Sequence, residues 1–151
     1  MTENRDLEAE SETIYHTMLS QLFDFNEICE AEEFGVKRTK NTLYKGTLVE
    51  RKRQGLGCLI YSNGRVYEGE WHDDLRNGRG YELYSNGATY LGQYQQNKPH
   101  GKGIFTWPNG EVYDGEWTLG IKEGFGVWKG ASGESYVGEW RNGKVNGYGV
   151  D

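Results

Sequence analysis

The chain has 151 residues, a net charge of −6, 14% aromatic residues and 23 glycines, about twice the usual glycine share. This length predicts one domain, and the absence of any run of about 18 apolar residues excludes a membrane-spanning helix. With only two prolines and 11 tyrosines, the composition indicates aromatic strands separated by tight turns and excludes a Pro/Gly-rich disordered chain. The mean hydropathy of −0.85 predicts a thin structure without a thick central core.

The charge is divided between two parts of the chain. Residues 1–33 hold ten acidic residues and one basic residue, a net charge of −9, whereas residues 34–151 carry +3. The acidic N-terminus has neither an apolar segment typical of a secretory signal nor the basic character of a mitochondrial presequence, so we expect a cytoplasmic protein. Cys29 and Cys58 are too few for a disulfide framework or a zinc site and are expected to stay reduced.

Residues 1–35 are expected to form an acidic N-terminal segment with an amphipathic helix over about residues 11–33. Its apolar stripe, with spacings of four and three residues, consists of Ile14, Met18, Leu22, Phe25 and Ile28. Gly35 is a plausible end for this helix. The acidic remainder makes it unsuited to a membrane surface. Two destinations stay open: the helix docks on the aromatic face of its own sheet, or it binds a partner or a second copy of the chain.

Residues 36–43 are expected to form a basic linker leading into the first repeat. Seven cations gather in this region: Lys37, Arg38, Lys40, Lys45, Arg51, Lys52 and Arg53. Such a cluster can attract anionic lipid, at about 1 kcal/mol per charge near a membrane. The alternative is an ordinary solvated charge run, which Glu50 interrupts. Nucleic acid is not expected as a partner, because an acidic protein gains little from counterion release.

Residues 44–151 contain five copies of a 23-residue unit, the last of them incomplete. The second copy begins Tyr67-Glu68-Gly69-Glu70-Trp71, and the aligned tyrosines are Tyr44, Tyr67, Tyr90, Tyr113 and Tyr136. Each tyrosine is followed at a fixed distance by a Gly-x-Gly pair. The dipeptides between copies are Asn63-Gly64, Asn86-Gly87, Asn109-Gly110 and Ser132-Gly133. This regularity predicts a β-hairpin repeat.

Asn-Gly between apolar runs predicts a type I′ hairpin turn, because both positions of that turn need a positive φ. A two-residue turn would pair Ile60 with Tyr67, Cys58 with Gly69 and Leu56 with Trp71. Alternation along the strand places Tyr67, Gly69 and Trp71 on one face, where the residue opposite the glycine is expected to fill the gap between the rings. The other face, which carries Glu68, Glu70, Glu116 and Glu139, is expected to be solvated.

The motif Tyr-x-Gly-x-Trp, followed by Gly-x-Gly and Asn-Gly at a 23-residue period, resembles the membrane occupation and recognition nexus (MORN) repeat. The first copy departs from it, with Leu48 at the aromatic position. The resemblance implies a mainly β fold, a single-layer twisted antiparallel sheet of stacked hairpins with a groove along one face. It also implies a scaffold, as in ciliary radial spokes, flagellar axonemes and cytoskeletal collars, or an accessory region of a larger enzyme such as a lipid kinase. Other proteins are the implied partners.

We therefore expect a non-enzymatic scaffold that holds a helical or extended partner segment on an aromatic groove. Tyrosine and tryptophan side chains, which dominate binding hot spots, are expected to contact the partner. These rings are Tyr67, Trp71, Tyr90, Tyr94, Trp107, Tyr113, Trp117, Trp128, Tyr136 and Trp140. No catalytic residue, metal site or cofactor is expected, because His16, His72 and His100 have no ligand or base at a suitable spacing. The Gly-x-Gly pairs lack the third glycine of a dinucleotide fingerprint, since Ile60 follows Gly55 and Gly57 there. The alternatives are an anionic-membrane adaptor and the accessory region of an enzyme.

Overall fold

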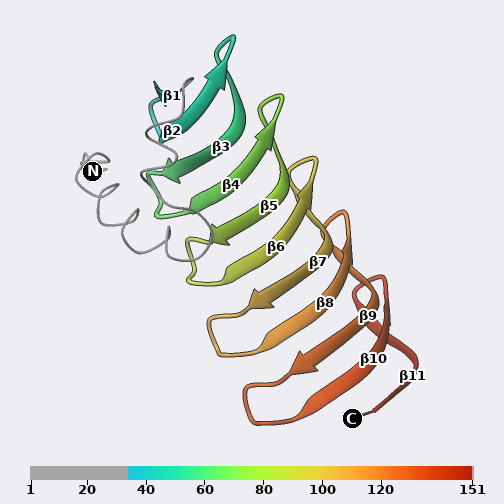
Figure 1. Cartoon of the computed structure of the whole chain (residues 1–151). Coiled ribbons are helices and arrows are strands. Elements are labelled where there is room, and N and C mark those ends of the chain that lie inside the picture. Colours follow the sequence, from blue (N-terminus) through green and yellow to red (C-terminus); the bar gives the residue numbers. More distant parts are fainter. Residues whose placement is uncertain (1–33, 151) are drawn as a thin grey trace.

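The computed structural model describes residues 34–150, and in this range the chain forms one open antiparallel sheet of eleven strands in sequence order (Figure 1). The strands are β1 (Phe34–Arg38), β2 (Thr42–Val49), β3 (Lys52–Tyr61), β4 (Val66–His72), β5 (Leu75–Leu83), β6 (Thr89–Gln95), β7 (Lys98–Thr106), β8 (Val112–Thr118), β9 (Ile121–Lys129), β10 (Ser135–Arg141) and β11 (Lys144–Val150). The predicted single sheet of stacked hairpins is confirmed. The predicted helix over residues 11–33, with its stripe, lies outside the described residues.

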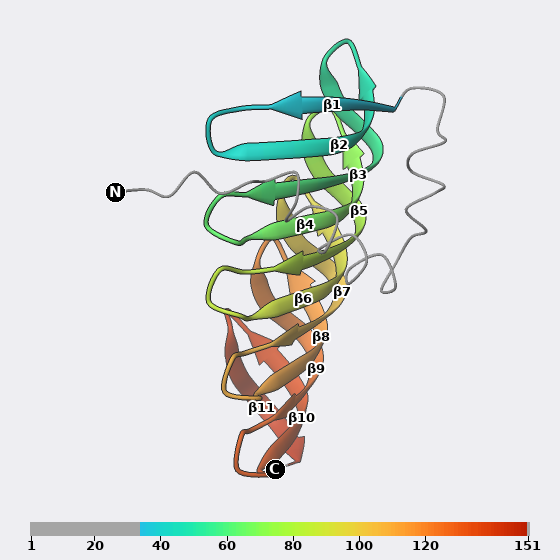
Figure 2. The same ribbon diagram turned by 90° about the vertical axis from the view of Figure 1, so that its left-hand side faces the viewer.

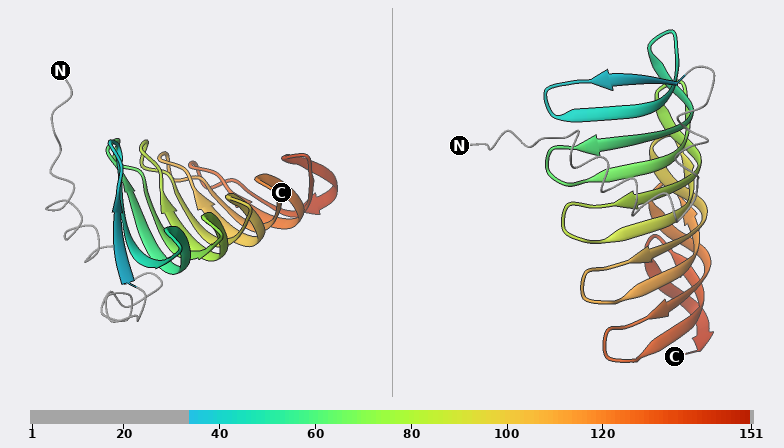
Figure 3. Two further views of the ribbon diagram at one scale, coloured as in Figure 1. Left: turned by 90° about the horizontal axis from the view of Figure 1, so that it is seen from above. Right: turned by 60° about the vertical axis from the view of Figure 1, so that its left-hand side comes forward.

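The sheet is a single layer that twists and curves along its length (Figures 2 and 3). Every strand is hydrogen-bonded to its neighbours in sequence, because each connection is a hairpin. Alternating strand residues therefore divide between two faces that no other described strand covers. Among residues 34–150 there is no helix long and apolar enough to span a membrane.

The sheet begins before the first repeat. Strand β1 pairs with β2, and Val36 lies opposite Lys45. Residues 36–38 of the expected basic linker are therefore part of the sheet. This strand has no counterpart in the 23-residue period, so the repeat alone does not predict it.

The Asn-Gly loops differ from the predicted type I′ turns. In the β3–β4 loop only Gly64 has a positive φ, of 93°, and Asn63 does not. The Gly64 N–H donates to the Tyr61 carbonyl (3.0 Å), and the Tyr61 N–H donates to the Arg65 carbonyl (2.8 Å). This arrangement is a three-residue loop closed by a bulge, in which glycine is needed at one position only.

The longer loop moves the strand pairing by one residue. The observed pairs are Leu59 with Tyr67, Gly57 with Gly69 and Gly55 with Trp71. The predicted partners Ile60, Cys58 and Leu56 are wrong by one position, so they lie on the face opposite the rings. Glycine therefore faces glycine across the sheet, and the strand partner does not fill the gap between the rings.

Two-residue turns do occur, at the other end of every hairpin. Asp73 and Asp74 both have positive φ, as do Gln96 and Asn97. The Asp74 N–H donates to the Arg53 carbonyl of the preceding hairpin (2.9 Å). Every later turn of this kind, at Asn97, Gly120 and Gly143, is hydrogen-bonded to the preceding hairpin in the same way.

Candidate protein-binding surface

We call the face that carries the repeat tyrosines the aromatic face. Each tyrosine ring crosses the glycine two residues later, and its hydroxyl donates to the carbonyl three residues later. The Tyr67 hydroxyl, for example, lies 2.8 Å from the Glu70 carbonyl, and the Tyr90 hydroxyl lies 2.7 Å from the Gln93 carbonyl. The buried phenol groups are thereby satisfied within their own strand.

The glycines beneath the tyrosine rings, which form a row across the strands, provide the space that these rings occupy. A Cβ placed on Gly57 would lie 2.1 Å from the Tyr44 hydroxyl, and one placed on Gly103 would lie 2.1 Å from the Tyr90 hydroxyl. Both distances are far inside van der Waals contact, and both glycines have ordinary extended φ values. Glycine is therefore required here for space and not for backbone conformation.

The rings form a continuous edge-to-face series across the repeats. Centroid distances between consecutive rings are 4.9–5.7 Å, the range preferred by aromatic pairs. Three tryptophan indoles also donate to glycine carbonyls of the preceding strand, as Trp117 does to Gly103 (3.0 Å). Burial raises the pKa of Tyr113 to about 12 and that of Tyr67 further. The aromatic face is thus the core of the molecule.

The structure places most of the predicted groove residues in this core. Eight of the ten have 7% or less of their surface exposed: Tyr67, Trp71, Tyr90, Tyr94, Tyr113, Trp117, Tyr136 and Trp140. Trp107 and Trp128 are only partly buried and pack against the others. The two exposed enough to offer ring surface are therefore those outside the Tyr-x-Gly-x-Trp motif.

Trp107 and Trp128 belong to a wider row of partly buried rings, which we call the aromatic stripe: Tyr61, Tyr84, Phe105, Trp107 and Trp128. These rings come from the ends of β3, β5, β7 and β9, beside the three-residue loops. Phe105 lies 5.6 Å from Tyr84 and 4.6 Å from Trp107 between ring centroids. Tyr61, Tyr84 and Phe105 were not predicted, although the 23-residue spacing of Tyr61, Tyr84 and Trp107 was a signal for them.

A buried carboxylate interrupts the aromatic face near the stripe. Glu82 is 1% exposed and stands in the row that otherwise alternates repeat tyrosines with Leu59, Phe105 and Trp128. Its oxygens accept hydrogen bonds from both Arg65 and Arg76, and from the Tyr94 hydroxyl at 2.7 Å. This charge is fully paired inside the protein, so it is a structural element of the core.

Lys122 lies on the aromatic face, and its ammonium group contacts mainly aromatic rings. Its Nζ lies 4.9 Å from the ring centroids of both Trp107 and Trp140. Burial lowers the pKa of Lys122, while the charge of Glu111 acts in the opposite direction. The Glu111 carboxylate instead accepts hydrogen bonds from Asn109 (2.8 Å) and Trp128 (3.2 Å). The ammonium is therefore available to a carboxylate supplied from outside.

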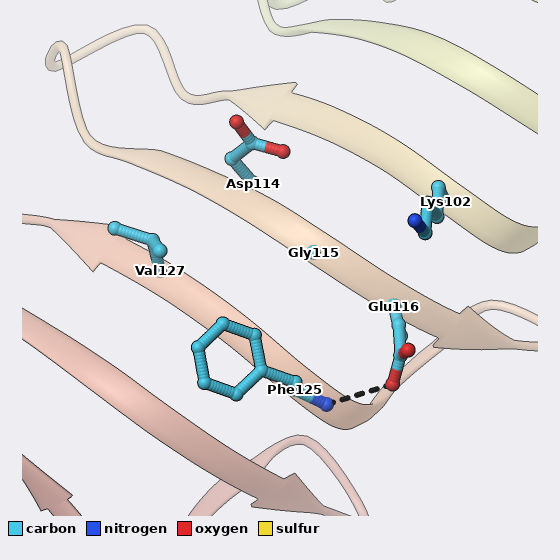
Figure 4. A pocket seen from close by; sticks show the side chains of 6 residues that line it. All are labelled: Lys102, Asp114, Gly115, Glu116, Phe125 and Val127. Carbon is cyan, nitrogen blue, oxygen red and sulfur yellow. Dashed lines mark hydrogen bonds between the residues drawn. The ribbon is translucent and has the colours of Figure 1, made fainter.

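The opposite face is less uniform and was predicted less well. Glu68 is buried, contrary to the predicted solvated face. Glu116, although exposed, accepts a hydrogen bond from the Phe125 backbone N–H (2.8 Å). Beside this bond lies a hollow of 290 Å³ between β7, β8 and β9 (Figure 4). It is lined by Lys102, Asp114, Gly115, Glu116, Phe125 and Val127, and Phe125 is 54% exposed.

The predicted lipid-binding cations do not form a single patch. Lys40 lies in the β1–β2 loop, whereas Arg51 and Lys52 lie at the β2–β3 turn at the other end of the strands. Lys37 donates to the Arg51 carbonyl (3.1 Å). Arg53 stacks on the Trp71 ring and pairs with Asp74 at 2.7 Å. Arg38 and Lys45 are on the opposite face. Lipid binding by these residues stays a prediction.

The histidines of the described region have structural contacts. His100 Nδ1 accepts a hydrogen bond from the Leu119 N–H (3.2 Å), and His72 lies 3.3 Å from the Gln54 side chain. Residues 34–150 contain no group of three His, Cys, Asp or Glu side chains arranged to hold a metal. His16 lies outside the described residues.

Stacked hairpins that share one row of rings and one row of glycines define a hairpin-repeat protein, a class whose members present extended surfaces. The family model of the MORN repeat matches residues 44–64, 67–89, 90–112, 113–135 and 136–150, and the chain belongs to this family. A comparison with curated proteins gave no match. Membership of the family indicates a protein-binding or membrane-associated scaffold.

Proposed function

We propose that this protein is a non-enzymatic scaffold that holds a helical or extended segment of another protein along its aromatic stripe. The observation that carries the proposal is the row of partly exposed rings on a single-layer sheet, where no second described layer covers them. Large rings of this kind supply contact area at low entropic cost and dominate binding hot spots.

The spacing of the stripe suits a regular partner. Tyr61, Tyr84 and Trp107 occupy the same position in successive repeats, two strands apart, which corresponds to about 9.6 Å. Side chains seven residues apart on a helix are separated by about 10.5 Å. Side chains three residues apart in an extended polyproline II segment lie on the same side and are separated by about 9.3 Å. A partner with apolar residues at either interval can place one on each repeat.

Lys122 adds a charge preference to this surface. Its ammonium lies between Trp107 and Trp140, and an entering Asp or Glu would pair with it in surroundings from which the rings exclude water. We therefore propose that the partner segment carries an acidic residue next to an apolar anchor. The resemblance to scaffold proteins supports a setting within a cytoskeletal or ciliary assembly, which is part of this proposal.

Affinity purification with the full chain as bait tests the proposal. Trp107→Ser with Trp128→Ser removes two rings of the stripe, and Phe125→Ser is the matched control because it removes an exposed ring from the opposite face. We expect specific partners to be retained by the parent and by Phe125→Ser but lost by the double variant. Melting curves verify that all baits are folded. Equal capture by all three, or loss by Phe125→Ser alone, would reject the stripe as the binding surface.

Charge reversal separates the two parts of the proposed recognition. Lys122→Glu is expected to weaken capture of a stripe-dependent partner, whereas Lys122→Arg is expected to keep it, because only the first repels an acidic residue. If both variants bind as the parent does, the partner is recognised by the rings alone. Cosedimentation of the parent with cytoskeletal and axonemal fractions tests the setting.

A further inference from the structure

A small apolar patch on the opposite face is buried, although no described strand lies over it. It consists of Leu43, Cys58, Ile60 and Val66, each 1% exposed or less, from strands β2, β3 and β4. Leu43 pairs with Ile60, and Ile60 pairs with Val66, so these three are direct neighbours across the strands. We call this group the N-terminal patch.

The same positions in later repeats are open to solvent or polar. Val66 corresponds to Thr89, Val112 and Ser135, none of which is buried. Cys58 corresponds to Ile104, which is 37% exposed. Strand geometry is the same in all repeats, and residues 34–150 provide no second layer over either face. The burial of the N-terminal patch is therefore not a property of the sheet alone.

We infer that the N-terminal segment over residues 11–33, which lies outside the described residues, covers this patch with its stripe of Ile14, Met18, Leu22, Phe25 and Ile28. The segment joins the sheet at β1, the strand next to β2, so it starts beside the patch. As a helix it would be about 34 Å long. The strands that carry the patch and its flanking Tyr81 and Leu83, β2–β5, span about 14 Å.

The charge of the N-terminal segment also supports its placement on the patch. The segment 1–33 carries ten acidic residues and one basic residue. Arg38 lies opposite Leu43, and Lys45 lies opposite Cys58, so cations border the patch on the side nearest the segment.

Binding of the segment to the N-terminal patch differs from binding to the aromatic face. The N-terminal patch and the aromatic stripe are on opposite faces, since their residues alternate along β3. A segment bound to the patch leaves the stripe accessible to a partner. The inference therefore does not depend on the proposed function and can fail without it.

Thiol labelling of Cys58 in the full chain tests the inference. Cys29→Ser leaves Cys58 as the single cysteine. In that background, Met18→Asp with Leu22→Asp places charges in the stripe, and Ser20→Asp with Thr13→Asp is the control with two charges away from it. We expect the first pair to raise the labelling rate at least about tenfold and the control to leave it unchanged, because labelling requires the cover to open. Unchanged far-ultraviolet circular dichroism and melting verify that the sheet remains folded.

A crosslink provides the complementary measurement. In the Cys29→Ser background, Leu22→Cys is expected to form a disulfide with Cys58 on mild oxidation, whereas Ser20→Cys is not. The inference is overturned if Cys58 is labelled rapidly in the parent, or if both charge variants label it at the same rate. It is also overturned if the protection of Cys58 depends on protein concentration, since a second copy would then be the cover.

Discussion

The first two repeats and the last three share one face and differ on the other. On the aromatic face, Tyr44 and Tyr113 make the same hydroxyl-to-carbonyl bond at 2.8 Å. On the opposite face, Val66 is buried while Val112, at the same repeat position, is partly exposed. The comparison shows that the 23-residue motif specifies one surface of the sheet. The other surface is free to vary because strand pairing does not depend on its side chains.

The physical basis of this difference is packing tolerance. A tyrosine ring that lies on a glycine at van der Waals distance leaves no room for a side chain there, so the tyrosines and the glycines beneath them recur in every repeat. A side chain that points into solvent has no such constraint. Apolar residues of the opposite face are therefore buried only where something packs over them, and elsewhere they stay exposed, as Phe125 does. Substitutions at the glycines, at two valines, at the tyrosines and at one turn test this division.

Glycine substitution tests whether the two regions are equivalent on the aromatic face. Gly57→Ala and Gly103→Ala should each lower the free energy of unfolding by at least about 3 kcal/mol, because both Cβ atoms would overlap a tyrosine hydroxyl. Gly110→Ala, which has open space but a φ of 94°, should cost only about 1 kcal/mol. Urea denaturation gives all three values. Unequal costs for Gly57 and Gly103 would mean that the repeats are not equivalent.

A matched pair of valines tests the difference on the opposite face. Val66→Asp should cost about 3 kcal/mol or more, because it buries an unpaired carboxylate, whereas Val112→Asp should cost less than about 1 kcal/mol. The cost at Val66 should shrink when Met18→Asp and Leu22→Asp are also present, since the cover is then already displaced. Equal costs at the two valines in urea denaturation would contradict the inferred cover.

Tyrosine ionisation compares the regions at high pH. Burial raises the pKa of Tyr113 to about 12 and raises those of Tyr44 and Tyr67 further. Since these folded-state pKa values lie above the ordinary value of 10, the stability that they contribute is complete below pH 10 and is lost as the pH rises through about 12. Phenolate absorbance should therefore show Tyr113 ionising before Tyr44 and Tyr67, as Tyr→Phe variants identify. Simultaneous ionisation near pH 10 would mean that the rings are accessible.

The two-residue turns provide the smallest test. Burial acts to raise the pKa of Asp74, but hydrogen bonds from the Arg53 backbone and guanidinium, together with its charge, hold it below the ordinary value of 3.8. The stability from this pair is present above pH 3.8 and is lost as the pH falls through the lower folded-state value. Asp74→Asn should cost less than about 1 kcal/mol at neutral pH and nothing in acid, because Asn97 fills the same position in the next repeat. Urea midpoints measured against pH check this; a loss that persists in acid would assign the effect to packing.

Much of the fold was predictable, because the repeated residues act within one or two neighbouring strands. The tyrosine period and the Gly-x-Gly pairs gave the single antiparallel sheet, and alternation gave the face shared by Tyr67, Gly69 and Trp71. The register was not predictable from Asn63-Gly64. That dipeptide serves both a two-residue type I′ turn and a three-residue loop with a bulge, and only the sheet selects between them.

The sequence predicted aromatic residues for the candidate surface, but it did not predict which of them are accessible. The periodic pattern selected Tyr90 and Trp117, and both are buried in the core because they belong to the repeating row of rings. On the aromatic face, the partly accessible rings are Trp107 and Trp128 together with the unpredicted Tyr61, Tyr84 and Phe105. The exposure of a ring depends on which side chains of neighbouring strands pack against it, and the periodic pattern of the sequence does not show this.

The hairpin repeat, the row of rings and the row of glycines could be recognised in the amino-acid sequence, because each follows from steric rules within one or two strands. Which rings form the core became evident only in the folded chain, as did the burial of Glu68, of Glu82 and of one part of the opposite face. Burial is a sum over contacts between distant residues, and those contacts exist only once the strands have been aligned and curved into one sheet.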